Sequence, residues 1–287
     1  MQFTPLEGLR DPAVVIAFSG WNDAGNAASD LLRHLIEAYP GSDAGIIDDE
    51  RFYDFQHTRP LLHRAADGPW VEWPAVRIRI VHHPERDLVV MLGPEPNLLW
   101  RTFATELIGK IKQIEPEIVL FLGAMLSDTP HSRPLPVGLY TSDPEVGRAF
   151  KMESSDYTGP TGMIGVAGQL MIHERIPSAS LWVSVPHYVS TPPNPKAQDA
   201  LLTELEGVLK ISVDHKDIPE EAVRWSTAVD QLSQQDPDIA EYIEQLEEAR
   251  DQEEVQEATG DTIAAELEKF LRRHVDDDGP DRPTAGG

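Results

Sequence analysis

Short, almost wholly apolar runs rich in β-branched residues recur along the first two thirds of the chain. They are AVVIAF at Ala13–Phe18, LVVML at Leu88–Leu92, IVLFLGAM at Ile118–Met125 and ASLWVSV at Ala179–Val185. Runs of this length without alternation predict strands that are buried on both faces, as in parallel sheets. The run VRIRIV at Val76–Val81 alternates instead, and it predicts a strand with one face in solvent.

Helical patterns follow several of these strands. The first helix has an apolar face from Ala27 to Ala38, and either Asn22 or Asp23 can cap it. Further helices are expected at Trp100–Ile114, through Gly168 to Glu174, and at Pro195–Leu209. The alternation of strands and helices predicts an α/β fold with a mostly parallel central sheet and flanking helices.

The pattern changes to acidic, amphipathic helices beyond about residue 212. Pro219–Gln235 and Pro237–Ala258 each begin with a proline suited to a first helical turn. Residues 276–287 lack apolar side chains and are expected to be disordered. We therefore expect an α/β domain at residues 1–212, an acidic helical extension at 213–275 and a disordered tail at 276–287.

The composition argues against several classes of partner and location. A net charge of -25 without a basic run disfavours nucleic acids and anionic membrane surfaces. Zero cysteines exclude disulfides and thiolate chemistry. The longest nearly apolar stretch, Ile118–Leu126, is far shorter than the roughly 20 residues that span a membrane. The N-terminus has neither a basic start nor an apolar signal core, so we expect a cytoplasmic protein.

Polar residues follow the ends of the predicted parallel strands. Asn22 and Asp23 come after the first strand, where they serve either as helix caps or as contacts to a ligand, because a helix N-terminus favours an anion. Asp128, His131 and Arg133 lie in a proline-rich segment after IVLFLGAM. They could bind a carboxylate or phosphate, or pair with one another in a purely structural role.

A glycine-rich segment and a strand-end histidine complete the candidate set. Thr161 and Gly162 precede a helix, and His187 follows ASLWVSV. A nucleophilic Thr161 would need a base such as His131 or His187, but there is no G-x-S-x-G motif and close packing explains the glycines equally well. We expect no metal, because the ten histidines show no ligand spacing. We expect no cofactor, because there is no glycine-rich phosphate loop with the lysine and paired carboxylates that nucleotide-metal chemistry uses. Since parallel strands end at one edge of a sheet, we expect one crevice formed by Asn22, Asp23, Asp128, His131, Arg133, Thr161, Gly162 and His187.

A second cluster is aromatic. Phe52, Tyr53, Phe55, Trp70 and Trp73 surround Arg59 in the sequence. Such residues more commonly fill a core, but aromatic side chains and arginine are also typical of interface cores. Because the acidic helices would repel their copies across a symmetric contact, we expect the aromatic segment and the proline-rich loops to be the surfaces of self-association.

Six segments together resemble, in this order, the bacterial branch of the proteasome assembly chaperone family, of the second chaperone's type. They are VVIAFSGWNDAGNAAS, GPEPNLLWR, LGAMLSDTPHSRP, YTGPTGMIG, SLWVSVPHYVSTPPNPKA and IAAELEKFLRR. The resemblance covers about residues 10–275. It implies an α/β fold of the phosphorylase/hydrolase-like kind in homo-oligomers, for which we expect a trimer first and a dimer second.

The resemblance implies a function without an established activity. Eukaryotic and archaeal relatives assist or bind proteasome particles, so we expect a non-catalytic, homo-oligomeric chaperone or scaffold with proteasome-related partners. The alternative is an enzyme or sensor, phosphorylase/hydrolase-like or ligase-like, that binds a small molecule in the crevice. Relatives that dock on the proteasome resemble one another in a C-terminal hydrophobic-Tyr-any tail, whereas this sequence ends Pro-Thr-Ala-Gly-Gly, so docking through the tail is not expected.

Overall fold

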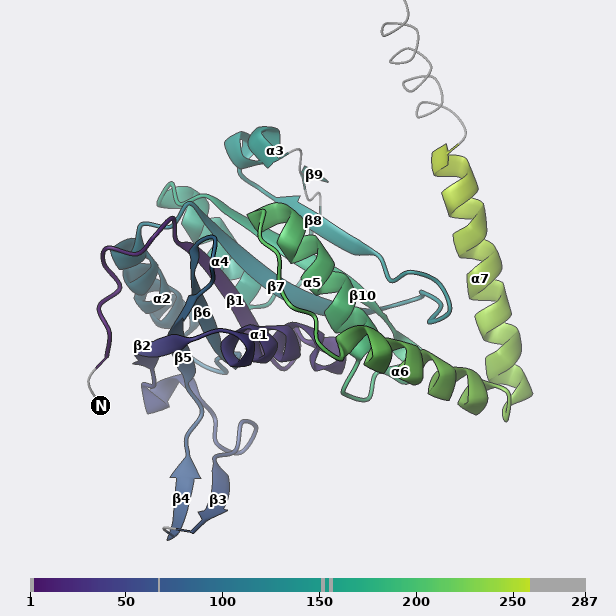
Figure 1. Cartoon of the computed structure of the whole chain (residues 1–287), viewed down its shortest axis with the longest axis horizontal. Coiled ribbons are helices and arrows are strands. Elements are labelled where there is room, and N and C mark those ends of the chain that lie inside the picture. Colours follow the sequence, from purple (N-terminus) through teal and green to yellow (C-terminus); the bar gives the residue numbers. More distant parts are fainter. Residues whose placement is uncertain (1–2, 67, 151–152, 155–156, 259–287) are drawn as a thin grey trace, which may run out of the picture. The chain divides into compact units, whose positions relative to one another are not determined.

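The computed structural model describes residues 3–66, 68–150, 153–154 and 157–258 of the 287-residue chain (Figure 1). The chain divides into two compact units, Met1–Leu232 and Ser233–Gly287. The second unit contains α7 (Pro237–Ala258). The predicted tail at residues 276–287 lies outside the described residues, as does the part of the predicted extension after residue 258.

The first unit extends past residue 212, where the sequence placed the end of the α/β domain, because α6 (Ile218–Ser233) packs onto it. Ile218, Ala222 and Val229 on one side of α6 are each at most 8% exposed. Ile218 belongs to the same apolar cluster as the central strands. Burial of this apolar face stabilises the contact, so α6 is part of the α/β unit.

An eight-stranded mixed sheet forms the centre of the first unit, in the order β2-β5-β6-β1-β7-β10-β8-β9. The inner strands run parallel: β6 (Asp87–Pro94), β1 (Ala13–Ser19), β7 (Ile118–Ser127) and β10 (Ser178–Pro186). The outer strands are β2 (Gly41–Ile47), β5 (Val76–His82), β8 (Val137–Thr141) and β9 (Glu153–Ser154). β5 pairs antiparallel with β2 and β6, and β8 pairs antiparallel with β10. The predicted α/β class with a mostly parallel central sheet is confirmed.

Helices cover both faces of this sheet. One face carries α1 (Ala27–Ala38) and α5 (Pro195–Leu209), and the other carries α2 (Trp100–Ile114) and α4 (Met163–His173). α3 (Pro144–Phe150) and the short 3-10 turns Ala24–Asn26, Glu50–Phe52 and His187–Val189 complete the helical elements of the first unit. Among the described residues, no helix is both long and apolar enough to cross a membrane.

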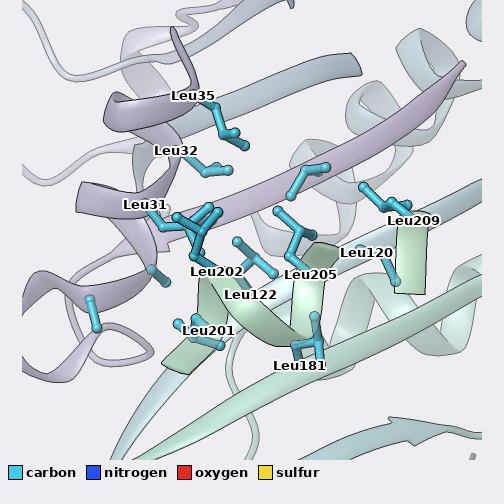
Figure 2. Packing of buried hydrophobic residues seen from close by; sticks show 14 of the residues in the cluster. Leu31, Leu32, Leu35, Leu120, Leu122, Leu181, Leu201, Leu202, Leu205 and Leu209 are labelled. Carbon is cyan, nitrogen blue, oxygen red and sulfur yellow. The ribbon is translucent and has the colours of Figure 1, made fainter. Parts of the chain in front are cut away.

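The central strand β1 contributes to both apolar cores. Alternate side chains of a strand point to opposite faces, so Val15 lies in the core under α1 and α5 while Val14 and Ile16 lie in the core under α2 and α4. All three are fully buried. Figure 2 shows leucines of α1 and α5 packed against leucines of β7 and β10. Burial of each such side chain contributes about 2 kcal/mol, which explains why continuous apolar runs form the inner strands.

β5 shows the alternation that its sequence predicted. Val76, Ile78 and Ile80 are buried, whereas Arg77 is exposed and Arg79 is half-buried. From Val76 to Ile80 the strand therefore presents one face to the core and one to solvent, whereas Val81 is buried in the core under α1 and α5.

A two-stranded ribbon, β3 (Leu61–Ala65) with β4 (Gly68–Glu72), forms a separate small sheet that the sequence did not predict. Figure 1 shows it projecting from the edge of the first unit where β5 begins. No residue of either strand is buried. Because neither core requires these side chains, the ribbon has no apolar periodicity from which to predict it.

The aromatic cluster of the sequence is divided between core and surface. Phe52 and Tyr53 are buried, whereas Trp70 and Trp73 are 47% and 56% exposed. Phe55 is half-buried and lies against Trp73, with ring centroids 5.1 Å apart. The expectation of a core therefore holds for Phe52 and Tyr53, with Phe55 packed at the edge of the same core, and fails for Trp70 and Trp73.

Candidate functional site

A cavity of about 1270 Å³ lies beside the carboxyl ends of β1 and β7 and continues to the beginning of β10. Its walls come from the loop after β1, the ends of β7 and β8, the first half of β10, and α4 with the glycine-rich segment before it. Trp21, Tyr140, Tyr157 and Trp182 supply aromatic surface. Open α/β sheets bind ligands at this edge, so the cavity is the candidate site.

The loop after β1 places Asn22 and Asp23 in the cavity wall. Asp23 caps α1, because its Oδ1 accepts hydrogen bonds from the backbone N–H of Ala28 at 2.9 Å and of Ser29 at 3.3 Å. Asn22 is held from the other side by its carbonyl oxygen, which accepts the N–H of Ala124 in β7 at 2.8 Å. The predicted capping role of Asp23 is confirmed.

Burial affects the ionisation of Asp23, whose side chain is almost completely enclosed. Desolvation raises the pKa of the Asp23 carboxyl above its ordinary value, against the hydrogen bonds from Ser29 and Ala28, which lower it. The effect of burial on the pKa of Asp23 is thus larger than the opposite effect of the two hydrogen-bond donors at the start of α1.

Glu95 caps the second helix at the cavity. It follows β6, and its Oε1 accepts the N–H of Met163 at the start of α4 at 2.6 Å. The same Oε1 accepts Asn22 Nδ2 at 2.6 Å. Sequence reasoning missed Glu95, although the residue lies at the end of a parallel strand within the segment GPEPNLLWR, and strand-end placement was the signal that could have found it.

Gly162 makes this capping arrangement possible. A Cβ at that position would lie 2.4 Å from Asn22 Oδ1 and 2.8 Å from Glu95 Oε1. Real side chains do not tolerate such approaches, so only glycine lets the Asn22 and Glu95 side chains reach the first turn of α4. The glycine predicted as a ligand contact is therefore required for packing.

The cavity does not suit the anion that the sequence suggested. Asp23 occupies the N-terminus of α1 and Glu95 that of α4, so protein carboxylates already complement both helix dipoles. Among the described residues, those that line the cavity include no lysine, arginine or histidine. A carboxylate or phosphate there would meet the charge of Asp23 without a cationic partner in the wall.

Asp128 and His187 meet outside the cavity lining. Ser127 of β7 is paired with Pro186 of β10, so the residues that follow them emerge side by side. Asp128 Oδ1 and His187 Nδ1 are 3.2 Å apart, and both side chains are well exposed. The parallel register of β7 and β10 therefore explains why Asp128 and His187 lie next to each other.

His131 turns towards α6. Its side chain is 1% exposed, with Nδ1 at 2.8 Å from the Tyr188 hydroxyl and Nε2 at 3.0 Å from Asp230 Oδ1. Trp225 of α6 lies against the ring, with centroids 6.4 Å apart, and Lys196 Nζ donates to the His131 carbonyl at 2.5 Å. His131 thus joins the proline-rich loop to α6.

The structure does not gather the eight predicted residues into one crevice. Asn22, Asp23, Thr161 and Gly162 line the cavity, whereas Asp128, His131, Arg133 and His187 are not among its lining residues. The cause is the proline-rich loop, which α6 engages through His131. Thr161 consequently has no histidine beside it in the cavity wall, and the nucleophile hypothesis loses its base.

Within the described part of the chain, no group of three or more histidine, cysteine, aspartate or glutamate side chains is placed to hold a metal ion.

A model of the PAC2 family matches residues 17–233. The chain is 42% identical to a PAC2 family protein of Streptomyces avermitilis, over 81% of this chain and 99% of that one, with a TM-score of 0.75. It is 41% identical to a proteasome-assembly chaperone homologue of Mycobacterium tuberculosis, over 80% of this chain and 99% of that one, with a TM-score of 0.73. An archaeal proteasome activator of Pyrococcus furiosus shares the fold, with a TM-score of 0.64 at 13% identity over 80% of this chain and 97% of that one. No curated protein sequence matches the chain.

Proposed function

The chain belongs to the PAC2 family, and on that premise we propose that it is a homo-oligomeric, chaperone-like or scaffold protein with proteasome-related partners in the cytoplasm. The observation that carries the proposal is the similarity to the mycobacterial proteasome-assembly chaperone homologue, which extends over nearly all of that protein. The resemblance of the sequence to proteasome assembly chaperones supports the same function.

The ribbon β3–β4 supplies an apolar surface for self-association. In its register Leu62 faces Val71, and these two lie on one face; Leu61 and Trp70 lie on the other. Their exposed fractions range from 44% to 63%. A two-stranded ribbon without a covered face is marginally stable in water, so contact with another surface would stabilise it.

Charge favours a second copy of the chain as the occupant of that surface. The chain has a net charge of -25, so most symmetric contacts would bring carboxylates together. The ribbon avoids this cost, because Glu72 is paired with His63 at 2.8 Å and with Arg77 at 3.2 Å. Arg64 adds a positive charge on the face of Leu62. An isologous contact through the ribbon would therefore bury apolar area with little repulsion.

The cavity favours a non-catalytic function over the enzyme alternative. Both helix N-termini at the cavity are filled by Asp23 and Glu95, and Thr161 has no histidine beside it in the wall. No described lining residue could activate a nucleophile or hold a transferred phosphoryl group.

Binding to purified proteasome particles and to their unassembled subunits tests the partner. We expect the immobilised full chain to retain one of these species. If the ribbon also contributes to the partner contact, replacing both Leu62 and Trp70 by serine should abolish this retention. Retention of none of them at micromolar concentrations would refute proteasome-related partners.

Light scattering on the full chain tests self-association. We expect an oligomer, with a trimer as the first expectation and a dimer as the second, and we expect L62S/W70S to shift it to monomer. Val223→Ser is the matched control, because Val223 is 67% exposed on α6 and away from the ribbon. A monomeric wild-type chain refutes the oligomer, and an unchanged oligomer in L62S/W70S refutes the ribbon as its contact.

A further inference from the structure

The ribbon β3–β4 carries exposed apolar side chains on both of its faces. Residues that lie opposite each other in an antiparallel pair share a face, so Leu62 and Val71 lie on one face, and Leu61 and Trp70 lie on the other. Each of the four is at least 44% exposed. A flat contact between the ribbons of two copies would cover one face of each ribbon and leave the other in water. Burial of both faces therefore requires a partner with a concave surface.

The cavity of the first unit carries a second exposed apolar surface. Trp21 in the loop after β1 is 69% exposed, and Met125 and Leu126 at the end of β7 are 41% and 52% exposed. All three line the cavity, and we call them the apolar rim. Large apolar side chains that gather in this way on a surface mark a contact site. The cavity volume of about 1270 Å³ exceeds the roughly 300–1,000 Å³ of small-molecule pockets, so several side chains have room in it.

The two apolar surfaces do not meet within one copy. No described residue of β3 or β4 lines the cavity. The apolar rim lies at the ends of the inner strands β1 and β7, whereas the ribbon precedes the outer strand β5 and projects from the edge of the first unit (Figure 1). A contact between the ribbon and the rim would therefore join two copies of the chain.

The charged side chains of the ribbon do not prevent such a contact. Glu72 is paired with His63 at 2.8 Å and with Arg77 at 3.2 Å. The His63 ring is stacked on Trp70, with ring centroids 4.2 Å apart, so this pair can be covered as one unit. Arg64 is exposed, and its long apolar stem lets the guanidinium reach water while its neighbours are covered. The described part of the ribbon can thus bury its apolar side chains without enclosing an unpaired charge.

We propose that the ribbon of one copy binds at the apolar rim of the cavity of the next copy. This inference rests on the proposed self-association and names the surface that receives the ribbon. The contact is heterologous, because it joins two different surfaces, so each copy gives its ribbon to one neighbour and receives the ribbon of another. Copies joined in this way close into a ring, such as the expected trimer, whereas ribbon-to-ribbon contacts join copies only in pairs.

Mixing two variants of the full chain tests whether the two surfaces form one contact. The ribbon variant L62S/W70S keeps the rim, and the rim variant W21S/L126T keeps the ribbon. All four replaced residues are exposed, so both variants should keep the thermal midpoint of the wild type. We expect each variant alone to sediment as a monomer. Their equimolar mixture should form a dimer through the one intact contact at about 100 μM, where a contact with a Kd of this size is substantially populated.

The matched control is V223S/L232T. Val223 and Leu232 are 67% and 62% exposed on α6, and neither belongs to the ribbon or lines the cavity, so we expect this variant to keep the wild-type oligomer. A monomeric wild type would refute self-association, and this contact with it. If the wild type is an oligomer, a rim variant that remains fully oligomeric, or a mixture that stays monomeric, would overturn the ribbon-to-rim contact alone.

Cross-linking gives a second readout that does not depend on weakening the contact, and it decides the question if the rim variant fails to fold. The chain has no cysteine, so Ala65→Cys at the end of β3 and Met125→Cys in the rim each introduce a single thiol. With a bismaleimide, we expect a covalent dimer from co-expressed A65C and M125C and none from either alone. Cross-linking of A65C alone as strong as that of the co-expressed pair would indicate a ribbon-to-ribbon contact and overturn the proposal, as would the absence of product from the pair.

Discussion

Gly162 has a larger structural effect than its size suggests. A single hydrogen on its Cα allows Glu95 and Asn22 to approach the first turn of α4, and through Glu95 the end of β6 is tied to the loop after β1. Three segments distant in the sequence thus meet at one glycine. The cavity depends on this junction, because Asn22 and Gly162 both line it.

Gly162→Ala should destabilise the first unit by about 1–3 kcal/mol, because the new Cβ would overlap Asn22 Oδ1 and Glu95 Oε1. Gly168→Ala is the matched control in the same helix, since a Cβ there meets nothing within 4 Å. We expect this second change to stabilise by about 0.5–1 kcal/mol, as replacement of glycine in a helix interior does. Urea denaturation of the two variants measures both effects, and equal stabilities would contradict the capping role of Glu95.

His215 should make the stability depend on pH. Burial lowers its pKa, but hydrogen bonds to Glu206 at 3.1 Å and Asp199 at 2.9 Å outweigh burial and raise the pKa above the usual value. Because the pKa of His215 is higher in the folded chain than in the unfolded chain, the protonated ring stabilises the fold. This stabilisation is complete below the unfolded-state pKa, about 6.5, and is lost as pH rises through the folded-state pKa. The difference in unfolding free energy between wild type and His215→Gln should therefore be largest near pH 6 and shrink towards pH 9. A difference that stays constant over this range would show that the ring acts through packing alone.

Among the elements, the inner strands and the helices that cover them could be predicted from the sequence, because burial on both faces leaves a continuous apolar run. β3, β4, β8 and α3 could not, since most of their residues are exposed or half-buried and carry little periodic signal. The candidate site was predicted in part for a related reason. Strand order places Asn22 and Asp23 at the correct edge, but only tertiary packing shows that His131 contacts Asp230 and that Glu95 reaches α4.

α6 behaves as part of the α/β unit, and truncation tests this. A chain that ends at Leu232 should keep the stability of the first unit, whereas one that ends at Ser212 should lose roughly 3–6 kcal/mol, about 1.5–3 kcal/mol for each of Ile218 and Val229. The shorter chain also exposes the His131 ring. Thermal unfolding of the two truncated chains measures the difference, and similar midpoints would mean that α6 packs without stabilising the sheet.

At the scale of the whole molecule, charge opposes the self-association that we propose for the apolar ribbon. The net charge of -25 repels copies at long range, and salt shortens the reach of that repulsion from about 30 Å at 0.01 M to about 10 Å at 0.1 M. Self-association should therefore strengthen several-fold between these two ionic strengths. Sedimentation at several protein concentrations measures it, and weaker association at higher salt would indicate that ion pairs, rather than apolar area, hold the copies together.

The exposure of β3 and β4 also bears on how such a protein evolves. None of their residues is buried, so substitutions in the ribbon cost little folding free energy, whereas most substitutions in the inner strands cost several kcal/mol. A lineage can therefore exchange one ribbon for another without first acquiring compensating mutations in the core. On the proposal that the ribbon is the contact surface, a change of partner needs substitutions in the ribbon and none in the sheet beneath it.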